Sequence, residues 1–123
     1  MEVTEGLPSV RADHAGLLQV LLNLLQNSRR ALSGSPNPRV RVTAYQLGSS
    51  VVMSLADNGP GVTRPESLFQ PFQSGGHSAG LGLYISRAIV RTYGGELQYY
   101  RRDRETCFLI ELPAMVDRQV AAV

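Results

Sequence analysis

The chain has 123 residues, enough for one hydrophobic core, and 43% of its residues are hydrophobic, as in an ordinary globular domain. Its formal net charge of +2 is too small to indicate a nucleic-acid partner, and no apolar run is long enough to cross a bilayer. All 12 basic residues are arginine, which excludes a Walker-type phosphate loop because that loop depends on a lysine. The single cysteine, Cys107, cannot form an internal disulfide, so we expect a buried structural thiol in a reducing cytoplasm.

A short strand and a long helix are the first elements that the sequence predicts. Residues 3 to 10 are interrupted by Gly6 and Pro8 and predict a short strand followed by a loop. Asp13 is a suitable N-cap for a helix from about residue 14 to residue 32. Residues 17 to 27 are apolar on nearly every side of that helix, which predicts that the helix is buried.

One polar stripe runs along the predicted first helix. Its residues follow one another at spacings of four, four and three and therefore share a face. Buried amides need hydrogen-bonding or metal partners, and a metal-bound phosphate is one candidate. A solvated stripe on an amphipathic helix is the alternative. The stripe consists of Gln19, Asn23, Asn27 and Arg30.

A hairpin and a glycine turn follow. Residues 40 to 46 and 51 to 56 flank a Gly-Ser turn and predict a β-hairpin. The second strand stops on Asp57, and Gly59 and Gly61 follow within the next four residues. Such a sequence is typical of a simple turn, but it also places a carboxylate beside backbone that a flat ligand can approach.

The middle of the chain is predicted to be a loop that leads into a second helix. A helical turn is expected near residues 66 to 69, and residues 73 to 79 have nothing large to bury, which predicts mobility. The glycine-rich segment from Ser78 to Leu83 then begins a helix that ends at Gly94. Free N–H groups at such a helix start attract phosphates. The face that we expect to be buried consists of Leu81, Ile85, Ala88, Ile89 and Thr92.

The remaining chain predicts a closing hairpin of residues 96 to 101 and 106 to 112, which Pro113 ends. Arg101, Arg102 and Arg104 cluster at its turn, and the acidic residues between and beside them predict a solvated turn. Two helices against a mixed or antiparallel sheet make a two-layer α/β (α+β) sandwich. We expect one domain over residues 1–113 and a tail over residues 114–123.

Four motifs stand in a fixed order along the chain: Asn23-x-x-x-Asn27, Asp57-x-Gly59-x-Gly61, Phe69-x-Pro-Phe72 and Gly80-Leu-Gly82-Leu. In that order the chain resembles the catalytic and ATP-binding domain of sensor histidine kinases, a branch of the gyrase, Hsp90, histidine kinase and MutL superfamily. The resemblance runs from about Asp13 to Pro113. It implies the Bergerat-type ATP-binding fold, in which a mixed sheet packs against helices, with ATP and Mg²⁺ as the cofactors.

The resemblance also implies roles for individual residues at the base end of the nucleotide. Asp57 matches the aspartate that accepts a hydrogen bond from the adenine amino group, and Gly59 and Gly61 let the base approach the backbone. Thr106 matches a threonine near the adenine, although an ordinary strand threonine looks the same.

At the phosphate end, Gly80, Leu81 and Gly82 match the second glycine box, whose backbone wraps the phosphates. Asn27 matches the Mg²⁺ ligand, and Arg30 matches a basic position that contacts phosphate. Asn23 matches the position at which ATP-hydrolysing relatives have a glutamate general base, and an amide cannot accept a proton in that way.

The function that the resemblance implies is transfer of the γ-phosphoryl group of ATP to a histidine on a separate dimerisation domain, contacted through Phe69 and Phe72. The response regulator is an indirect partner, and we expect no contact of this domain with nucleic acid or membrane. We expect a cytoplasmic domain; the anchor of a membrane-bound parent would lie outside this chain. His14 and His77 lack the context of a phosphoacceptor, so the isolated domain should not phosphorylate itself.

Three other functions remain open from the sequence. In the family that the chain resembles, Gly-Thr or Gly-Ser precedes Gly-Leu-Gly-Leu at the end of the loop that closes over the phosphates, the lid, which is residues 73–79 here. The pair Ser78-Ala79 departs from this pattern, which favours a degenerate nucleotide-binding module that regulates by docking. An anti-sigma serine kinase of the same superfamily would act on a protein hydroxyl. A hydrolysing ATPase of the gyrase type is disfavoured by Asn23.

Overall fold

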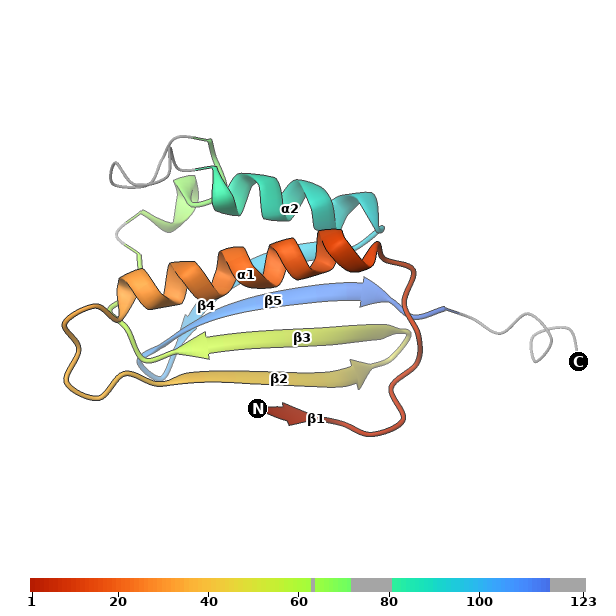
Figure 1. Cartoon of the computed structure of the whole chain (residues 1–123), viewed down its shortest axis with the longest axis horizontal. Helices are drawn as coiled ribbons and strands as arrows, with labels where there is room; N and C mark the ends of the chain where they lie inside the picture. The colour runs from red at the N-terminus through yellow and green to blue at the C-terminus, as the bar shows by residue number, and fades with distance from the viewer. Residues whose placement is uncertain (63, 72–80, 116–123) are drawn as a thin grey trace, which may run out of the picture.

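The structure is a computed structural model that describes residues 1–62, 64–71 and 81–115. Two helices lie side by side on one face of a five-stranded sheet, so the predicted two-layer sandwich is confirmed (Figure 1). Phe72, Gly80 and the lid segment 73–79 lie outside the described residues, as does the tail from residue 116. The elements in chain order are β1 (Glu2–Val3), α1 (His14–Ala31), β2 (Val40–Leu47), β3 (Ser50–Asp57), a 3-10 turn (Pro65–Ser67), α2 (Gly82–Thr92), β4 (Glu96–Arg102) and β5 (Glu105–Pro113).

The sheet has the strand order β1-β2-β3-β5-β4 and is mixed, because β1 pairs with β2 in parallel and the other pairs are antiparallel. Both predicted hairpins are present, β2 with β3 and β4 with β5. One row of the sheet crosses three strands: Asp57 on β3 is opposite Thr106 on β5, which is opposite Arg101 on β4. Residues that face each other in antiparallel strands put their side chains on the same face, so this row presents three polar side chains together.

The hydrophobic core lies between the two helices and the sheet. Its residues come from α1, α2 and strands β3 to β5, and none has more than 3% of its surface exposed. Phe108 is the largest fully buried side chain, and it packs against Tyr99 with ring centroids 5.5 Å apart. The core consists of Val20, Leu24, Leu55, Val90, Leu97, Phe108, Ile110 and Leu112.

The helix α1 begins as predicted, because the Asp13 carboxylate accepts a hydrogen bond of 2.9 Å from the backbone N–H of Gly16. The prediction that this helix is buried was wrong for its outer face. Leu18, Leu22 and Leu25 have 50%, 46% and 40% of their surfaces exposed. A helix in a two-layer domain has one face against the sheet, and a run of leucines does not bury its other sides.

The buried face of α2 also differs from the predicted one. Ser86 and Val90 are buried, whereas Ile85 is 40% exposed and Ala88 and Thr92 are exposed too. The prediction considered only apolar residues and left out Ser86. This serine lies on the side of α2 that contacts α1. The end of α2 was predicted correctly, since Gly94 adopts the left-handed φ of +77°.

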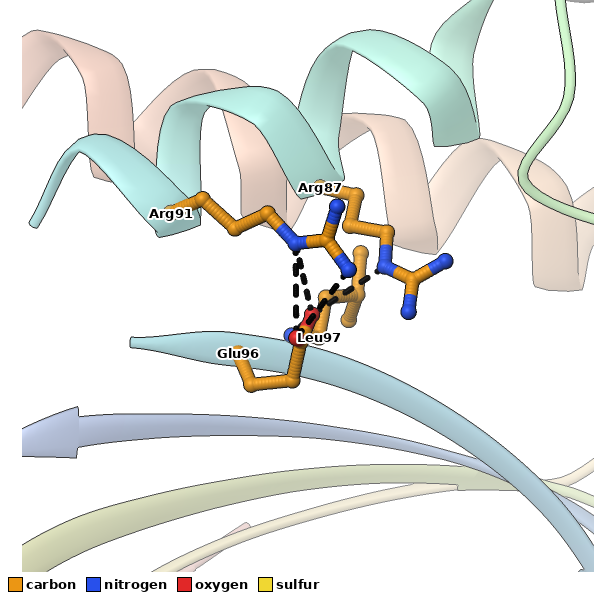
Figure 2. A network of polar contacts seen from close by, with 4 residues as sticks. All are labelled: Arg87, Arg91, Glu96 and Leu97. Carbon is orange, nitrogen blue, oxygen red and sulfur yellow. Dashed lines mark hydrogen bonds and ion pairs between the residues drawn. The ribbon is translucent and has the colours of Figure 1, made fainter. Parts of the chain in front are cut away.

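The corner between α2 and β4 is held by two arginines that converge on one carboxylate (Figure 2). Arg87 and Arg91 on α2 lie 3.1 Å and 3.2 Å from the oxygens of Glu96, whose Oε1 also accepts the N–H of Leu97. Burial acts to raise the pKa of Glu96, but the hydrogen bonds from Arg91, Arg87 and the Leu97 N–H outweigh it and lower that pKa. The guanidinium of Arg87 also lies 4.6 Å from the ring centroid of Phe69. This cation–π contact joins α2 to the segment that follows the 3-10 turn.

The segment before α1 contacts the residues that follow β5. The predicted short strand followed by a loop is present, since β1 covers only Glu2–Val3. Val10 forms an isolated bridge with Ala114, and the N–H of Met115 donates to the carbonyl of Ser9. The boundary between domain and tail after residue 113 stays a prediction. No helix within the described ranges is long and apolar enough to span a bilayer.

Candidate functional site

The carboxylate of Asp57 is the centre of the site's first end. It lies at the end of β3 with 1% of the residue exposed, and both of its oxygens accept hydrogen bonds. Ser28 on α1 donates to Oδ2 at 2.8 Å, and the backbone N–H of Gly59 donates to Oδ1 at 2.9 Å. Each carboxylate oxygen has a second lone pair, so Asp57 is a fixed acceptor that can take a further donor.

Gly59 and Gly61 are both required by their surroundings. A Cβ on Gly59 would lie 2.9 Å from Oδ1 of Asp57, which would disturb the hydrogen bond that orients the carboxylate. Gly61 has a φ of +84°, and its Cβ would lie 2.9 Å from Nη1 of Arg101. The lack of a side chain thus leaves room for the Asp57 carboxylate at Gly59 and for the Arg101 guanidinium at Gly61. That a base approaches the same backbone stays a prediction.

The predicted solvated turn is present, with Arg102, Asp103 and Arg104 exposed, and Arg101 beside it also takes part in the site. Its Nη1 donates to the carbonyl oxygen of Gly59 at 2.7 Å and to Oγ1 of Thr106 at 2.8 Å. Thr106 is 3% exposed and lies in the row between Asp57 and Arg101. The guanidinium thus joins the glycine turn after β3 to the hairpin of β4 and β5.

Asn58 fastens the loop that precedes β2 to the same turn. Its side chain donates to the carbonyl of Asn37 at 2.7 Å and accepts from the N–H of Arg39 at 2.8 Å. A cavity of about 670 Å³ opens beside the turn, lined by Gly59, Arg101 and the loop after α1 at residues 33–36. Asn58 therefore forms part of the wall of an open cavity whose lining includes Gly59 but not Asp57.

The second end of the site is the junction of α1 with the start of α2. The amide nitrogen of Asn23 donates to the carbonyl of Gly82 at 3.3 Å and to Oγ of Ser86 at 3.0 Å. The amide oxygen of Asn23 accepts from Gln19 at 2.9 Å. Partners for this amide were expected, and the partners that the structure gives it are protein groups. Leu81 and Gly82, both half-buried, bring the first N–H groups of α2 to this place.

Asn27 lies on α1 one turn beyond Asn23, between the two ends of the site. It is half-buried, and in the described part of the chain its side chain makes no hydrogen bond. An amide oxygen is a hard ligand that suits Mg²⁺, an ion that usually keeps several waters and takes only one or two protein ligands. The described residues contain no cluster of three or more His, Cys, Asp or Glu side chains that could hold a metal. The role of Asn27 as a Mg²⁺ ligand therefore stays a prediction.

The predicted site residues fall into these two ends. Asp57, Gly59, Gly61 and Thr106 lie together at the first end, and Asn23 and Gly82 lie together at the second. Arg30 is exposed near the C-terminal end of α1. Gly80 lies outside the described residues.

Ser28 and Arg101 are the two site residues that sequence reasoning missed. Ser28 follows Asn27 on the leucine-rich helix α1. It is a small polar residue four positions after the buried Leu24, and this spacing could have indicated that Ser28 is buried on the same face. Arg101 carried no local signal, because its role depends on the pairing of β4 with β5.

Cys107 is buried, with 4% of its surface exposed, as the sequence predicted. Burial raises the pKa of its thiol, although the hydrogen bond with Tyr100 acts in the opposite direction. A thiol with a raised pKa is a poor nucleophile, so we assign Cys107 to the core.

Comparison with known proteins adds to this geometry. The model of the family described as "Histidine kinase-, DNA gyrase B-, and HSP90-like ATPase" matches residues 12–116. The chain is 37% identical over 99 residues to the C4-dicarboxylate transport sensor protein DctB of Rhizobium meliloti (strain 1021), covering 78% of this chain and 16% of DctB. It is 32% identical over 119 residues to the sensor histidine kinase ZraS of Escherichia coli (strain K12), covering 94% of this chain and 25% of ZraS. The chain thus spans a quarter or less of the length of these two sensor proteins.

Solved structures show the same likeness. The nucleotide-free catalytic domain of histidine kinase ThkA superposes with a TM-score of 0.80 at 30% identity, covering 92% of this chain and 77% of that one. Full-length ShkA in complex with AMPPNP superposes with a TM-score of 0.74 at 31% identity, covering 94% of this chain and 25% of that one. These likenesses confirm the fold that the four motifs predicted.

Proposed function

The chain belongs to the histidine kinase-, DNA gyrase B- and HSP90-like ATPase family as an ATP-binding domain of the histidine kinase type, and we propose that it transfers the γ-phosphoryl group of Mg-ATP to a histidine on a separate dimerisation domain. The observation that carries the proposal is the buried Asp57 carboxylate, which Ser28 and the N–H of Gly59 orient as an acceptor at the end of β3. A phosphoacceptor histidine is not assigned to this chain. His14 is exposed at the start of α1, and His77 lies outside the described residues.

Recognition of the base is the role that we give to the first end of the site. The amino group of adenine would donate to Asp57, whose remaining lone pairs point away from Ser28 and Gly59. Guanine has a carbonyl at that position and would place an acceptor against an acceptor. Gly59, Gly61 and Thr106 would line the space next to the base.

Positioning of the phosphates is the role that we give to the second end. The N–H groups at the start of α2, in Leu81 and Gly82 and with Gly80 before them, would bind phosphate oxygens, and Arg30 would add a positive charge. Asn27 would hold Mg²⁺, which when bound supplies charge neutralisation of the phosphates. Catalysis in this proposal consists of orientation and electrostatic stabilisation of the transferring group.

Asn23 supports transfer to a protein side chain over transfer to water. Its amide is engaged by Gln19, Gly82 and Ser86, so it offers no base that could activate a water molecule. We propose that the γ-phosphate is therefore kept for a nucleophile that another domain supplies. For the same reason we expect the isolated domain neither to label itself nor to hydrolyse ATP quickly.

The dimerisation domain is the partner that we propose, with the response regulator as an indirect partner. Phe69 is half-buried, and Arg87 holds its ring from one side. We propose that Phe69 and Phe72 contact the dimerisation helices at the edge of the lid segment. Because ATP is the phosphoryl donor, we place the domain in the cytoplasm.

Two other functions make different predictions. A degenerate module would bind nucleotide without transferring phosphate, and its support is the pair Ser78-Ala79, which lies outside the described residues. A serine kinase of the same superfamily would make an acid-stable phosphoester.

The test uses ATP that carries a radioactive γ-phosphate, with and without the dimerisation domain of a sensor histidine kinase. Label that appears on that domain alone and is lost in acid supports the proposal, because a phosphoramidate hydrolyses in acid whereas phosphoserine survives. Acid-stable label would support the serine kinase, and no label on a well-folded partner would support the degenerate module. Asp57→Ala serves as a control that should reduce labelling at ATP concentrations that do not saturate the variant.

A further inference from the structure

We propose that Arg39 and Arg104 speed the binding of ATP, because they place uncompensated positive charge at the end of the domain that carries the base contacts. The inference rests on the proposed function and adds to it two residues that touch neither the base nor the phosphates in that proposal. It concerns the rate at which ATP reaches the site, whereas the residues of the site hold the nucleotide once it is bound.

The first step is the distribution of arginine in the fold. At one end of the domain α1 and β3 end, β2 begins and β4 turns into β5, and we call this the basic end (Figure 1). Seven arginines lie there, against the three carboxylates of Asp57, Asp103 and Glu105. The arginines are Arg29 and Arg30 in the last turn of α1, Arg39 and Arg41 at the start of β2, and Arg101, Arg102 and Arg104 at the hairpin.

The second step is that both carboxylates of the hairpin are already paired. Nη2 of Arg41 lies 2.8 Å from Oε1 of Glu105, and Nε of Arg102 lies 3.5 Å from Oδ2 of Asp103. Each pair cancels one positive and one negative charge. The carboxylates of the hairpin therefore do not neutralise the other arginines of the basic end.

The third step is the position of the two arginines in the proposal. Arg39 and Arg104 make no ion pair with any residue that the structure describes, and both are exposed. They line one cavity of about 810 Å³ between the start of β2 and the hairpin. Arg104 also lines the cavity of about 670 Å³ that includes Gly59 and Arg101. Their positive charge therefore lies close to the glycine turn that follows β3.

The fourth step is the opposite charge of the remaining domain. In the rest of the described chain, six carboxylates outnumber four arginines. Residues 116–123 add one carboxylate and one arginine, so they leave this balance unchanged. An anion is therefore attracted to the basic end and repelled by the rest of the domain, and such a charge distribution steers a ligand to its site. Mg-ATP is a suitable ligand, because Mg²⁺ neutralises only part of the charge of the triphosphate.

Backbone strain at Arg104 independently supports a role outside the fold. Its φ of +65° is in the left-handed region, and two-residue hairpin turns with positive φ favour glycine. The arginine therefore strains the turn, and its side chain forms no ion pair with the described residues that would offset the strain. Strain of this kind points to a residue with a function.

The test measures the association rate of ATP by stopped-flow fluorescence. The chain has no tryptophan, so a fluorophore on the ribose of ATP supplies the signal. Arg39→Glu reverses one charge and should slow association about fivefold at low ionic strength. In about 1 M salt the screening length falls to about 3 Å, so the rates of variant and wild type should then agree within about twofold.

Arg11→Glu is the matched control, because it makes the same charge reversal at an exposed residue of the opposite end, beside the bridge of Val10 with Ala114. It should not slow association. Arg39→Glu protein that associates within about twofold of wild type at low ionic strength would overturn the proposal and leave ATP binding intact. A slower rate that persists in about 1 M salt would indicate a direct contact and would also overturn it. Failure of the wild type to bind ATP would instead overturn the proposed function.

Arg104→Gly separates a role in binding from a role in folding. It should slow association about threefold at low ionic strength. In urea unfolding it should be at least as stable as the wild type, because glycine adopts the positive φ without strain. A wild-type association rate in this variant would remove Arg104 from the proposal, and a loss of stability would contradict the strain from which its role is inferred.

Discussion

Ser28 and Asp57 are 29 residues apart in the chain, and a hydrogen bond of 2.8 Å between their side chains joins α1 to the end of β3. Both residues are almost fully buried, with 0% and 1% of their surfaces exposed. The hydrogen bond therefore has two consequences. It gives a buried carboxylate a donor, and it orients the carboxylate that we propose as the acceptor for the adenine amino group.

Ser28→Ala should destabilise the domain by about 1 to 3 kcal/mol, because a buried carboxylate loses a donor that water cannot replace. Urea unfolding measures the free energy of unfolding of the variant and the wild type. Ser49→Ala, an exposed serine in the turn between β2 and β3, is the control and should cost little. A Ser28→Ala variant as stable as the wild type would mean that another group reaches Asp57.

Asp57→Ala should weaken ATP binding by about tenfold to over a hundredfold, as expected for a lost hydrogen bond of about 1.5 to 3 kcal/mol to a charged group. Asp57→Asn should also bind more weakly, because the amide has a single acceptor oxygen, which the N–H of Gly59 requires, and it carries no charge. Calorimetric titration gives both affinities, and Asp103→Asn at the exposed turn is the control. Unchanged ATP affinity in both variants would remove Asp57 from the site.

Asn27→Ala should weaken ATP binding in Mg²⁺ much more than in a chelator, because the interaction that is lost belongs to the ion. Four titrations are needed: wild type and variant, each with Mg²⁺ and with chelator. Gln26→Ala, on the exposed side of the same turn, should change neither condition. An equal loss with and without Mg²⁺ would show that Asn27 has only a structural role.

Asn23 and Ser86 should show a coupling free energy of about 0.5 to 1.5 kcal/mol in a double-mutant cycle, because a hydrogen bond of 3.0 Å joins them across the helix interface. The cycle uses Asn23→Ala, Ser86→Ala and the double variant, each unfolded in urea. Gln26→Ala paired with Ser86→Ala is the control cycle, since Gln26 is exposed on α1 and none of the hydrogen bonds described for Asn23 or Ser86 involves it. Additive effects of Asn23→Ala and Ser86→Ala would contradict the direct contact.

Glu96 should make stability depend on pH in acid. Its folded pKa lies below the ordinary value of 4.5, so the stabilisation is complete at a pH above that value and is lost as the pH falls through the lowered pKa. At neutral pH, Glu96→Gln should cost about 0.5 to 1 kcal/mol, since both ion pairs are partly exposed. Glu5→Gln, in an exposed loop, is the control. A cost that persists unchanged well below pH 4.5 would rule out the ion pairs as its source.

The elements that depend on local pattern were predicted from the sequence, and those that depend on distant partners were not. Both hairpins follow from β-rich runs around short turns, and the ends of both helices follow from Asp13 and Gly94. The apolar pattern on α2 indicated the wrong face, because the residue that meets α1 is the polar Ser86. The leucines of α1 suggested that the helix is buried on all sides. The sheet lies on one side of the helix only, so Leu18, Leu22 and Leu25 on the outer side remain exposed.

The candidate site shows the same division. Asp57, Gly59, Gly61 and Thr106 were predicted through motifs that stand close together or in a known order, and the structure brings them together. Arg101 was missed because the predicted hairpin places it opposite Thr106 but does not show that it also reaches Gly59, which lies 42 residues away across the pairing of β3 with β5. Asn23 was matched to the position of a general base in ATP-hydrolysing relatives, and its contacts with Gly82 and Ser86 of α2 could not be predicted from the sequence.

The turn between β4 and β5 has a consequence for how the length of this chain can vary. It consists of Asp103 and Arg104, both with positive φ, and its two-residue length fixes the pairing of Arg101 with Thr106. Because side chains alternate along a strand, one inserted residue on the β4 side of the pairing would turn Arg101 to the opposite face of the sheet. Insertions at this hairpin tip that keep the register in step should leave the hydrogen bonds of Arg101 to Gly59 and Thr106 intact, whereas a slip by a single residue should remove both without replacing any residue of the site.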